Sequence, residues 1–281
     1  MTISWYPGHM AKAKRQLQEQ LSRADVVIEV CDARIPLSSR NPDLDQLIQH
    51  KRRILLLNKA DLADPALTAA WEGYYKAQGL PVLALNSLRS ASRVVPLIDA
   101  SAREKVEKAQ SRGIRKTVRA MVVGVPNVGK STLINLIKGK ATIKTADKPG
   151  VTRSTQWFRI TPYLELMDSP GLLWPRLEDP KAAQRLAYIG SVKDQVHDML
   201  KLCLGLLDDL MRTHAALLLA RYKLEDDSLR GERLLEAICA SRGFLLRGGE
   251  LDLERGIVTV LDEFRAGKIG RITLEVPESC G

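Results

Sequence analysis

The segment GVPNVGKS at residues 124–131 has the spacing G-x-x-x-x-G-K-[ST], which is typical of a phosphate-binding loop. Gly124 and Gly129 allow backbone N–H groups to curl around phosphate oxygens. Lys130 can reach the β- and γ-phosphates of a nucleotide, and the hydroxyl of Ser131 can bind magnesium. A strand-like run precedes the loop and the helical TLINLIKG follows it, so the phosphates are expected at a helix N-terminus. The other nucleotide-binding residues predicted in this stretch are Asn127, Val128 and Thr132.

The tetrapeptide NKAD at residues 58–61 follows the apolar run RILLL and predicts which base the nucleotide carries. Asp61 can accept two hydrogen bonds from the N1–H and N2–H₂ edge of guanine, which adenine does not present. Asn58 is expected to help hold the base, and the stem of Lys59 to pack on its face. Four residues of this kind also occur in ordinary strand-to-helix turns. Beside a phosphate loop they favour guanine, which argues against an ATPase or a kinase.

Three further loops supply the remaining candidate residues. In ALNS, Asn86 and Ser87 end a strand where a second guanine contact is expected, through the backbone N–H of Ser87. In KPGVTRST, Thr152 offers a hydroxyl for magnesium and for the γ-phosphate. In DSPG, Asp168 is expected to act as a magnesium carboxylate and Gly171 as a γ-phosphate N–H donor.

Two residues have catalytic interpretations that the sequence leaves open. Leu172 follows Gly171, where many nucleotide hydrolases have a Gln that orients the attacking water. His9, in a Pro-Gly turn before an amphipathic helix, can accept a hydrogen bond from that water as a neutral ring. Alternatively, His9 caps the helix or contacts an RNA phosphate. Asn127 either holds K⁺ beside the phosphates through its side-chain carbonyl or only stabilises the loop turn.

These loops need a sheet to position them, and the chain alternates between strand-like and helical runs. The predicted strands are 25–33, 52–58, 80–85, 117–124, 154–160 and 163–168, and the helical runs between them include 41–50, 64–78 and 94–110. Several strands are apolar throughout, as expected when both faces of a parallel sheet are covered. The alternation predicts an α/β fold with a doubly wound, mostly parallel sheet. From about residue 176 the pattern is helical, so we predict two domains, 1–175 and 176–281.

The order of the motifs differs from that of ordinary small GTPases, in which the phosphate loop comes first and NKxD late. Here NKAD precedes the phosphate loop, and DSPG comes last. A parallel sheet tolerates such a circular permutation if the old termini are joined and the chain is opened at a surface loop. The helical stretch 94–112 is the expected joint. The chain then runs from the DSPG loop directly into the helical domain, which couples the two.

The net charge of +10 belongs to the first part of the chain. Residues 1–175 contain 27 Lys and Arg against 15 Asp and Glu, whereas residues 176–281 contain 16 against 18. The basic stretches, which favour a polyanion or form a solvated surface, are 12–15, 51–53, 112–119 and 138–148. Contacts of the helical part with RNA depend on local clusters such as Arg242, Arg247, Arg265, Lys268 and Arg271.

Other features of the sequence predict a cytoplasmic protein with no membrane partner. No apolar run approaches the ~20 residues of a membrane span, and the N-terminus lacks the apolar core of a signal peptide. The cysteines form no CxxC pair, so we expect reduced side chains that act as small apolar residues, and no zinc site. They are Cys31, Cys203, Cys239 and Cys280.

The chain resembles the ribosome biogenesis GTPase A family of circularly permuted GTPases (YlqF/RbgA). The resemblance rests on WYPGHMAKA, DARIP, NKAD, GVPNVGKS, PGVT and DSPG, and on RGGELDLER and DEFRAGKIGRITLE near the end. It implies a magnesium-dependent GTPase that binds GTP and GDP and acts in late assembly of the large ribosomal subunit, with its helical domain on ribosomal RNA. It also associates His9 with hydrolysis.

Two points remain open beside this resemblance. The family's usual Ser-Ala pair is Asn86-Ser87 here, which puts the second guanine contact in question. An alternative function is a nucleotide-dependent RNA-binding scaffold with negligible hydrolysis, because Leu172 cannot orient water. We expect the free protein to be a monomer.

Overall fold

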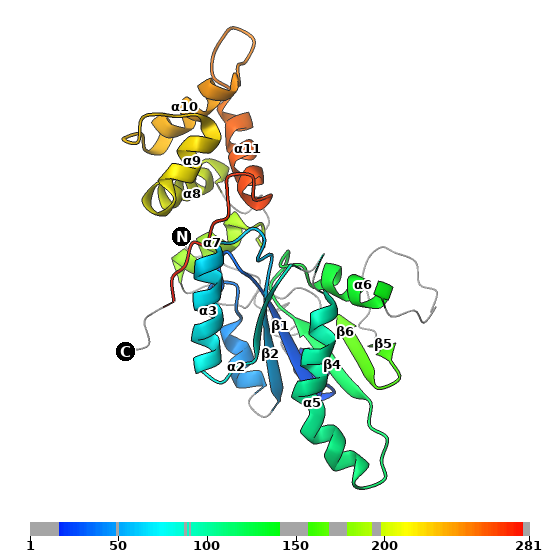
Figure 1. Cartoon of the computed structure of the whole chain (residues 1–281). Helices are drawn as coiled ribbons and strands as arrows, with labels where there is room; N and C mark the ends of the chain where they lie inside the picture. Colours follow the sequence, from blue (N-terminus) through cyan, green and yellow to red (C-terminus); the bar gives the residue numbers. More distant parts are fainter. Residues whose placement is uncertain are drawn as a thin grey trace.

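The computed structural model describes residues 17–48, 51–86, 89, 91–140, 157–168, 179–192 and 198–277. A central sheet is flanked by helices, and a smaller group of helices lies beyond one end of it (Figure 1). This arrangement confirms the predicted α/β architecture, a mostly parallel sheet followed by helices. The predicted division into 1–175 and 176–281 stays a prediction.

Within the described residues, six strands form one sheet in the order β3-β2-β1-β4-β6-β5. All neighbouring pairs are parallel except β5 with β6, which is antiparallel. Every residue of β1 is buried, as expected for a strand that is covered on both faces. The strands are β1 (Val26–Asp32), β2 (Arg52–Asn58), β3 (Val82–Leu85), β4 (Val118–Val123), β5 (Trp157–Thr161) and β6 (Leu164–Asp168).

Helices cover both faces of the sheet, so the sheet is doubly wound. Ile28 and Val30 of β1 point into the larger core with residues of α5 and α6. Val27 and Cys31, on the other face, pack with residues of α2 and α3 respectively. The helices of this part are α2 (Pro42–Leu47), α3 (Pro65–Ala77), α5 (Val94–Gln110) and α6 (Lys130–Lys140), with a short 3₁₀ turn η1 (Ala91–Arg93) before α5.

Three of the helices in the helical unit begin at aspartate caps. Asp179, Asp198 and Asp252 each accept a backbone N–H in the first turn of the helix that follows. The helical pattern expected from about residue 176 is interrupted at His214, which leaves helical geometry with φ −142°. The helices are α7 (Pro180–Tyr188), α8 (Met199–Thr213), α9 (Ala215–Tyr222), α10 (Gly231–Arg242) and α11 (Leu253–Arg265).

The chain after α11 returns to the sheet. The N–H groups of Ile272 and Leu274 donate to the carbonyls of Leu62 and Arg34, at 3.0 and 2.8 Å. The carboxylate of Glu275 is buried and accepts hydrogen bonds from residues 37 and 38. Residues 272–275 therefore pack against the sheet domain, although they follow the last helix.

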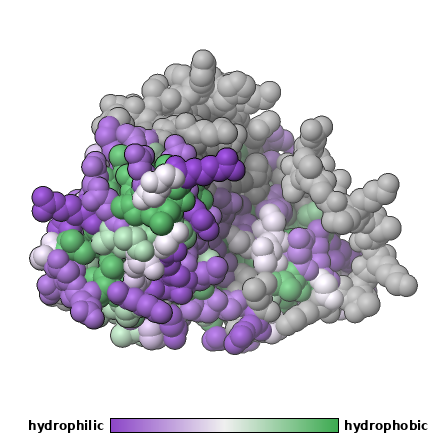
Figure 2. Space-filling view, turned by 90° about the horizontal axis from the view of Figure 1, so that it is seen from above, coloured by the Kyte–Doolittle hydropathy of each residue, from purple (hydrophilic) through white to green (hydrophobic). Residues whose placement is uncertain are grey.

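Seen from above Figure 1, the described surface is mostly hydrophilic, with smaller hydrophobic areas (Figure 2). Large exposed hydrophobic side chains of the helical unit are Leu217, Leu245, Leu246 and Val258. Among the described residues, no helix is long and apolar enough to cross a membrane. The free cysteines in the same residues are all buried, as small apolar residues would be: Cys31, Cys203 and Cys239.

Candidate nucleotide site

Parallel pairing brings the predicted site residues to one end of the sheet. Asp32, the last residue of β1, lies opposite Asn58, the last residue of β2. Val122 of β4 lies opposite Asp168, where β6 ends. Ligands bind at the carboxyl ends of the strands in open α/β sheets. We call this end of the sheet the carboxyl end, and the opposite one the amino end.

The phosphate loop between β4 and α6 has the predicted conformation. Gly124 has φ +151°, and a Cβ at this position would collide with the carbonyl oxygen of Val30 in β1. Only glycine therefore fits there. Gly129 has φ +98° and accepts the N–H of Leu133, which starts the helical hydrogen bonding of α6. The first N–H groups of α6 remain directed toward the loop, as an anion site requires.

Lys130 is buried with little compensation for its charge. Its side chain is 6% exposed, and Nζ donates to the carbonyl of Val125 at 2.8 Å. Burial lowers the pKa of Lys130 to about 8, while the charge of Asp168 opposes this shift. An ammonium group in this position gains a counter-charge when phosphates enter the loop, as predicted for this residue.

The residues beside Lys130 fit a magnesium ion. Ser131 Oγ donates to Asp168 Oδ2 at 3.0 Å. The other carboxylate oxygen, Oδ1, is buried without a hydrogen-bond partner among the described residues. Burial raises the pKa of Asp168, although Ser131 and Lys130 act in the opposite direction. A hydroxyl next to an unsatisfied carboxylate oxygen is the ligand chemistry that magnesium prefers.

Phosphates and water would have to complete the shell of this ion. The described residues contain no cluster of three His, Cys, Asp or Glu side chains that would hold a metal alone. Magnesium usually binds through one or two protein groups and the phosphates of its substrate. The site therefore suits magnesium that arrives with a nucleotide.

The NKAD loop contacts the phosphate loop directly. Asn58 is buried and donates from Nδ2 to the carbonyl of Val128 at 2.7 Å. Lys59 adopts φ +60° and donates from Nζ to the carbonyl of Asn127 at 2.6 Å. Asp61 is exposed to solvent, where a base can reach it. The contacts of these three side chains with guanine stay predictions.

A buried ion pair supports the NKAD loop, and the sequence analysis gave its residues no role. Arg34 holds both oxygens of the fully buried Asp32, with Nε 2.9 Å from Oδ1 and NH2 2.8 Å from Oδ2. Lys59 Nζ lies 3.1 Å from the same Oδ2. Burial opposes ionisation of Asp32, but Arg34 and Lys59 outweigh it and hold the pKa of Asp32 far below its usual value. The available signal was a charged pair, DAR, at the end of a strand that is mostly apolar.

The same arginine connects the sheet to the helical unit. Arg34 NH1 donates to the carbonyl oxygens of Phe264 and Arg265, at 2.9 and 3.2 Å, where α11 ends. A cation at a helix C-terminus also interacts favourably with the helix dipole. The side chain of Arg34 thus joins Asp32 to the end of α11, and Asp32 in turn pairs with Lys59.

The phosphate loop itself touches the residues that follow α7. Ser191 Oγ donates to the carbonyl of Pro126 at 2.6 Å. Asn127 has φ +63° and donates from Nδ2 to the carbonyl of Gly190. Asparagine tolerates this left-handed conformation better than most residues. The side chain of Asn127 is therefore directed to the helical unit, and both interpretations of this residue stay predictions.

The structure thus brings together part of the predicted set. Val128 is buried in the loop, Thr132 is exposed in the first turn of α6, and Asn86 is half-buried just after β3. The other four residues lie outside the described residues: His9, Ser87, Thr152 and Gly171. Their predicted roles stay predictions.

The phosphate loop, the Ser131–Asp168 pair and the NKAD loop at one end of a parallel sheet define a P-loop GTPase with permuted motif order. A sequence profile described as "50S ribosome-binding GTPase" matches residues 119–230. The crystal structure of GNP-bound YlqF from T. maritima is similar, with a TM-score of 0.67 and 27% identity. The alignment covers 95% of this chain and 99% of that one.

Full-length relatives identify the family. The chain is 42% identical to ribosome biogenesis GTPase A of Bacillus cereus over 284 residues, covering 100% of this chain and 96% of the relative. It is 43% identical to the protein of the same name from Priestia megaterium, covering 99% and 98%. The chain belongs to the ribosome biogenesis GTPase A family, and it is a GTPase.

Proposed function

We propose that this GTPase acts in late maturation of the large ribosomal subunit and that the subunit stimulates its GTP hydrolysis. The profile description "50S ribosome-binding GTPase" and the names of the relatives support this assignment. The observation that carries it is a site with two buried groups suited to phosphate and magnesium, Lys130 and Asp168, in a chain with Leu172 after DSPG. Such a site binds GTP, but another group has to orient the attacking water. The free protein is then a cytoplasmic monomer.

Each site residue has a defined task in this proposal. Lys130 binds the β- and γ-phosphates, and Asp61 and Asn58 hold guanine, with Asn86 and Ser87 on its other side. Ser131, Thr152 and Asp168 hold magnesium, and Gly171 donates its N–H to the γ-phosphate. When bound, magnesium offsets the charge that develops on the phosphate oxygens. The basic surfaces of the protein and its helical unit contact ribosomal RNA.

His9 is the residue proposed to act on the attacking water. Leu172 has no hydrogen-bonding group, so an acceptor must come from another segment or from the ribosome. A neutral imidazole beside the γ-phosphate accepts a hydrogen bond from water and orients it. Contact with the subunit would bring the segment around His9 over the site, which explains why hydrolysis would need the ribosome.

The experiment compares wild type and His9→Ala for GTP affinity, co-sedimentation with large subunits, and turnover with and without subunits. We expect wild-type turnover to rise when subunits are added. His9→Ala should retain affinity and binding but lose most of this increase, about a hundredfold in turnover. His9→Gln, which keeps an acceptor oxygen, should recover part of it. Wild-type turnover that ignores subunits would contradict ribosome stimulation, and normal stimulated turnover in His9→Ala would assign the water to another group.

A further inference from the structure

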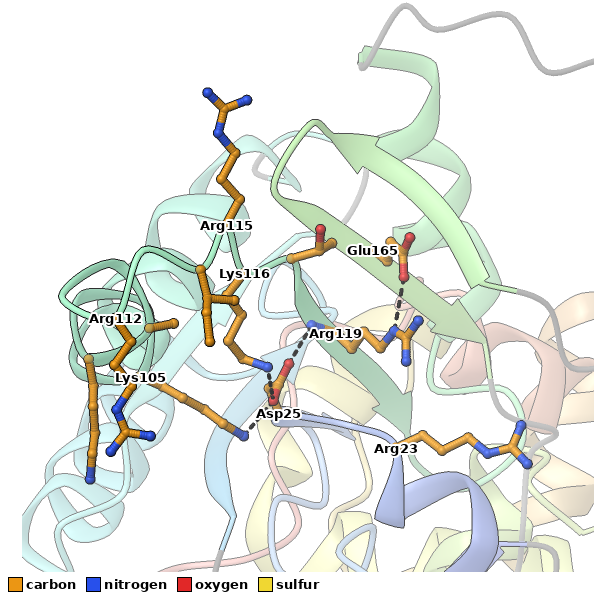
Figure 3. Close-up of a pocket in the computed structure, with 12 residues that line it drawn as sticks. Arg23, Asp25, Lys105, Arg112, Arg115, Lys116, Arg119 and Glu165 are labelled. Atoms are coloured by element: carbon orange, nitrogen blue, oxygen red, sulfur yellow. Dashed lines mark hydrogen bonds and ion pairs between the residues drawn. The ribbon is translucent and has the colours of Figure 1, made fainter.

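A hollow of about 600 Å³ lies at the amino end of the sheet, away from the nucleotide site. It is formed by Arg23 and Asp25 before β1, the last turns of α5, the segment 112–119, and Glu165 of β6. Among the described residues, seven cationic side chains but only two carboxylates line it. We call this lining the basic surface (Figure 3).

Asp25 holds part of the basic surface in place. Its carboxylate is 9% exposed and forms ion pairs with Lys105 and with Lys116, the latter at 3.2 Å. It also accepts the backbone N–H of Arg119 at 3.0 Å. Burial opposes ionisation of Asp25, but these hydrogen bonds outweigh it and lower its pKa. Figure 3 shows Asp25 at the centre of the hollow, with the lysines reaching it from two segments. The carboxylate therefore stays charged and fixes the two lysines.

Other cations of the basic surface are available to a ligand. Among the residues that the structure describes, no ion pair forms to Lys108, Arg112 or Arg115. Lys108 lies in the last turn of α5, and all three side chains belong to exposed residues. In Figure 3 the guanidinium of Arg115 points away from the protein. An anionic partner would thus meet three uncompensated charges on a prepared surface.

The basic surface continues into two smaller hollows. One, of about 360 Å³, shares Asp25, Lys105 and Lys108 with it and extends to Lys51 and Arg52. The next, of about 540 Å³, begins at these two residues and ends near the start of β3. Their lining also contains Glu104 and Glu107, and Arg52 pairs with Glu104, but among the described residues Lys and Arg outnumber the carboxylates in each hollow. A row of mainly basic hollows suits an extended polyanion better than a small anion.

The chemistry of the lining favours the phosphate backbone of folded RNA. A protein partner usually buries aromatic or apolar anchors and few lysines, but among the described residues of the hollow the only large apolar side chain is Ile114. Unpaired bases need aromatic side chains to stack on, and none of the described lining residues is aromatic. Lysine and arginine contacts to phosphates need neither feature. We propose that the basic surface binds the backbone of a ribosomal RNA helix, as a second attachment point remote from the nucleotide; this rests on the proposed ribosomal function.

The basic surface lies far from the nucleotide site. The six residues of β4 separate Lys116 and Thr117 from the phosphate loop, which is about 20 Å along the strand. Charges this far apart are screened at physiological salt. The contribution of the basic surface to binding should therefore be the same with GTP and with GDP, unlike contacts made by loops around the nucleotide.

The experiment uses charge reversal at matched lysines. Lys108 and Lys76 each lie in the last turn of a helix, both are exposed, and α5 and α3 cover opposite faces of the sheet. Replacing either lysine by Glu should weaken the favourable interaction with the dipole of its helix by about the same free energy. Affinity of the full chain for large subunits is measured from 50 to 200 mM KCl, with a GTP analogue and with GDP. The variants are Lys108→Glu, Lys76→Glu and the combination Lys108→Glu/Arg112→Glu/Arg115→Glu.

We expect Lys108→Glu to weaken binding about tenfold at 0.1 M salt and to reduce the salt slope by about one, and the triple variant to reduce it by about three. Both effects should be equal in the two nucleotide states, with unchanged GTP turnover in the absence of subunits. Lys76→Glu should bind as wild type does. Cross-links from position 112 should reach RNA.

Three results would overturn the proposal: binding of the triple variant that equals that of Lys76→Glu, a loss confined to one nucleotide state, or cross-links from position 112 to a ribosomal protein. Wild type that fails to bind subunits at all would instead contradict the proposed function. Thermal unfolding of the variants checks that each is folded.

Discussion

The phosphate loop at the carboxyl end of the sheet and Asp25 at the amino end treat their buried charges in opposite ways. At the carboxyl end, burial lowers the pKa of Lys130 and raises that of Asp168, so both groups are pushed toward their neutral forms. At the amino end, hydrogen bonds from Lys105, a backbone N–H and Lys116 lower the pKa of Asp25 despite its burial. The phosphate loop therefore lacks charges that a nucleotide and magnesium supply. The amino end is complete in itself and presents surplus positive charge.

This contrast explains how one domain can serve two kinds of anion. A buried cation with an incomplete environment gains most from a ligand that fits it closely, which favours a specific, high-affinity site. Exposed cations around a satisfied carboxylate give weaker, salt-dependent attraction that tolerates many backbone geometries. The predictions below test whether the two ends are independent.

The largest expected effect is the loss of Lys130. Lys130→Ala removes the buried ammonium at the β- and γ-phosphates, so GTP affinity and turnover should fall by about two to three orders of magnitude. Lys108→Ala removes one charge at the amino end and should leave GTP affinity and turnover unchanged. Equilibrium binding of a fluorescent GTP analogue and single-turnover hydrolysis measure the two quantities. Wild-type values for Lys130→Ala would refute the assignment of the phosphate loop.

The second effect concerns stability and compares two arginine–carboxylate pairs. Arg34→Met leaves Asp32 buried without its main partner, which should lower the free energy of unfolding by about 3–5 kcal/mol. Arg119 pairs with Glu165 on the exposed basic surface, so Arg119→Met should cost only about 0–1 kcal/mol. Urea unfolding measures both. Adding Asp32→Asn to Arg34→Met should restore part of the lost free energy of unfolding. Equal losses for Arg34→Met and Arg119→Met would contradict the expected difference between the buried pair and the exposed pair.

The third effect is a pH dependence specific to the carboxyl end. The pKa of Lys130 is about 8 in the free protein, and bound phosphates must raise it, because they favour the charged form. Binding therefore takes up a proton above pH 8. GDP affinity should be constant below pH 8 and fall by about tenfold per pH unit above it.

Titration calorimetry between pH 7 and 9.5, in buffers of different ionisation enthalpy, measures both the affinity and the proton uptake. Lys130→Arg is the control, because arginine does not titrate in this range. Any pH dependence that remains in this variant comes from ionisation of guanine. A wild-type affinity that stays level to pH 9 would show that Lys130 is not the group that meets the phosphates.

Local signals were sufficient for the strands and the phosphate loop. The run RRILLLN coincides with β2, and the Asp-Pro start before α3 is realised by the cap at Asp64. Spacing alone placed Lys130 and Ser131, because a strand, a glycine loop and a helix fix the geometry within a few residues. The Ser131–Asp168 pair followed from motif identity.

Long-range contacts were not predictable in the same way. Arg34 reaches Phe264, 230 residues later, and Glu275 accepts the N–H of Ser38 across 237 residues. Nothing periodic in residues 272–275 distinguishes a segment that packs on the sheet from a terminal coil. The basic surface also joins segments that are distant in the sequence. The sequence therefore reveals the charges, but it does not reveal that Asp25 holds two of the lysines in place.

The smallest expected effect separates the two interpretations of Asn127. Its side-chain amide donates to the carbonyl of Gly190, whereas a K⁺ ion would use its carbonyl oxygen. If K⁺ binds, it stabilises the phosphates by on the order of 1 kcal/mol, and hydrolysis should be about fivefold faster in K⁺ than in Na⁺. Asn127→Gly keeps the left-handed backbone at φ +63° but loses both roles. Asn127→Asp keeps an oxygen ligand but cannot donate to Gly190.

Potassium binding predicts that Asn127→Asp retains the preference for K⁺ and that Asn127→Gly loses it. A purely structural role predicts equal rates in the two salts for wild type and a similar, modest loss of stability in both variants, about 1 kcal/mol for one hydrogen bond. Steady-state hydrolysis at constant ionic strength, together with thermal unfolding, separates the two. Because the hydrogen bond to Gly190 joins the phosphate loop to the helical unit, a K⁺ ion that competes for this side chain would also loosen that contact. K⁺ would then act on both parts of the protein through one residue.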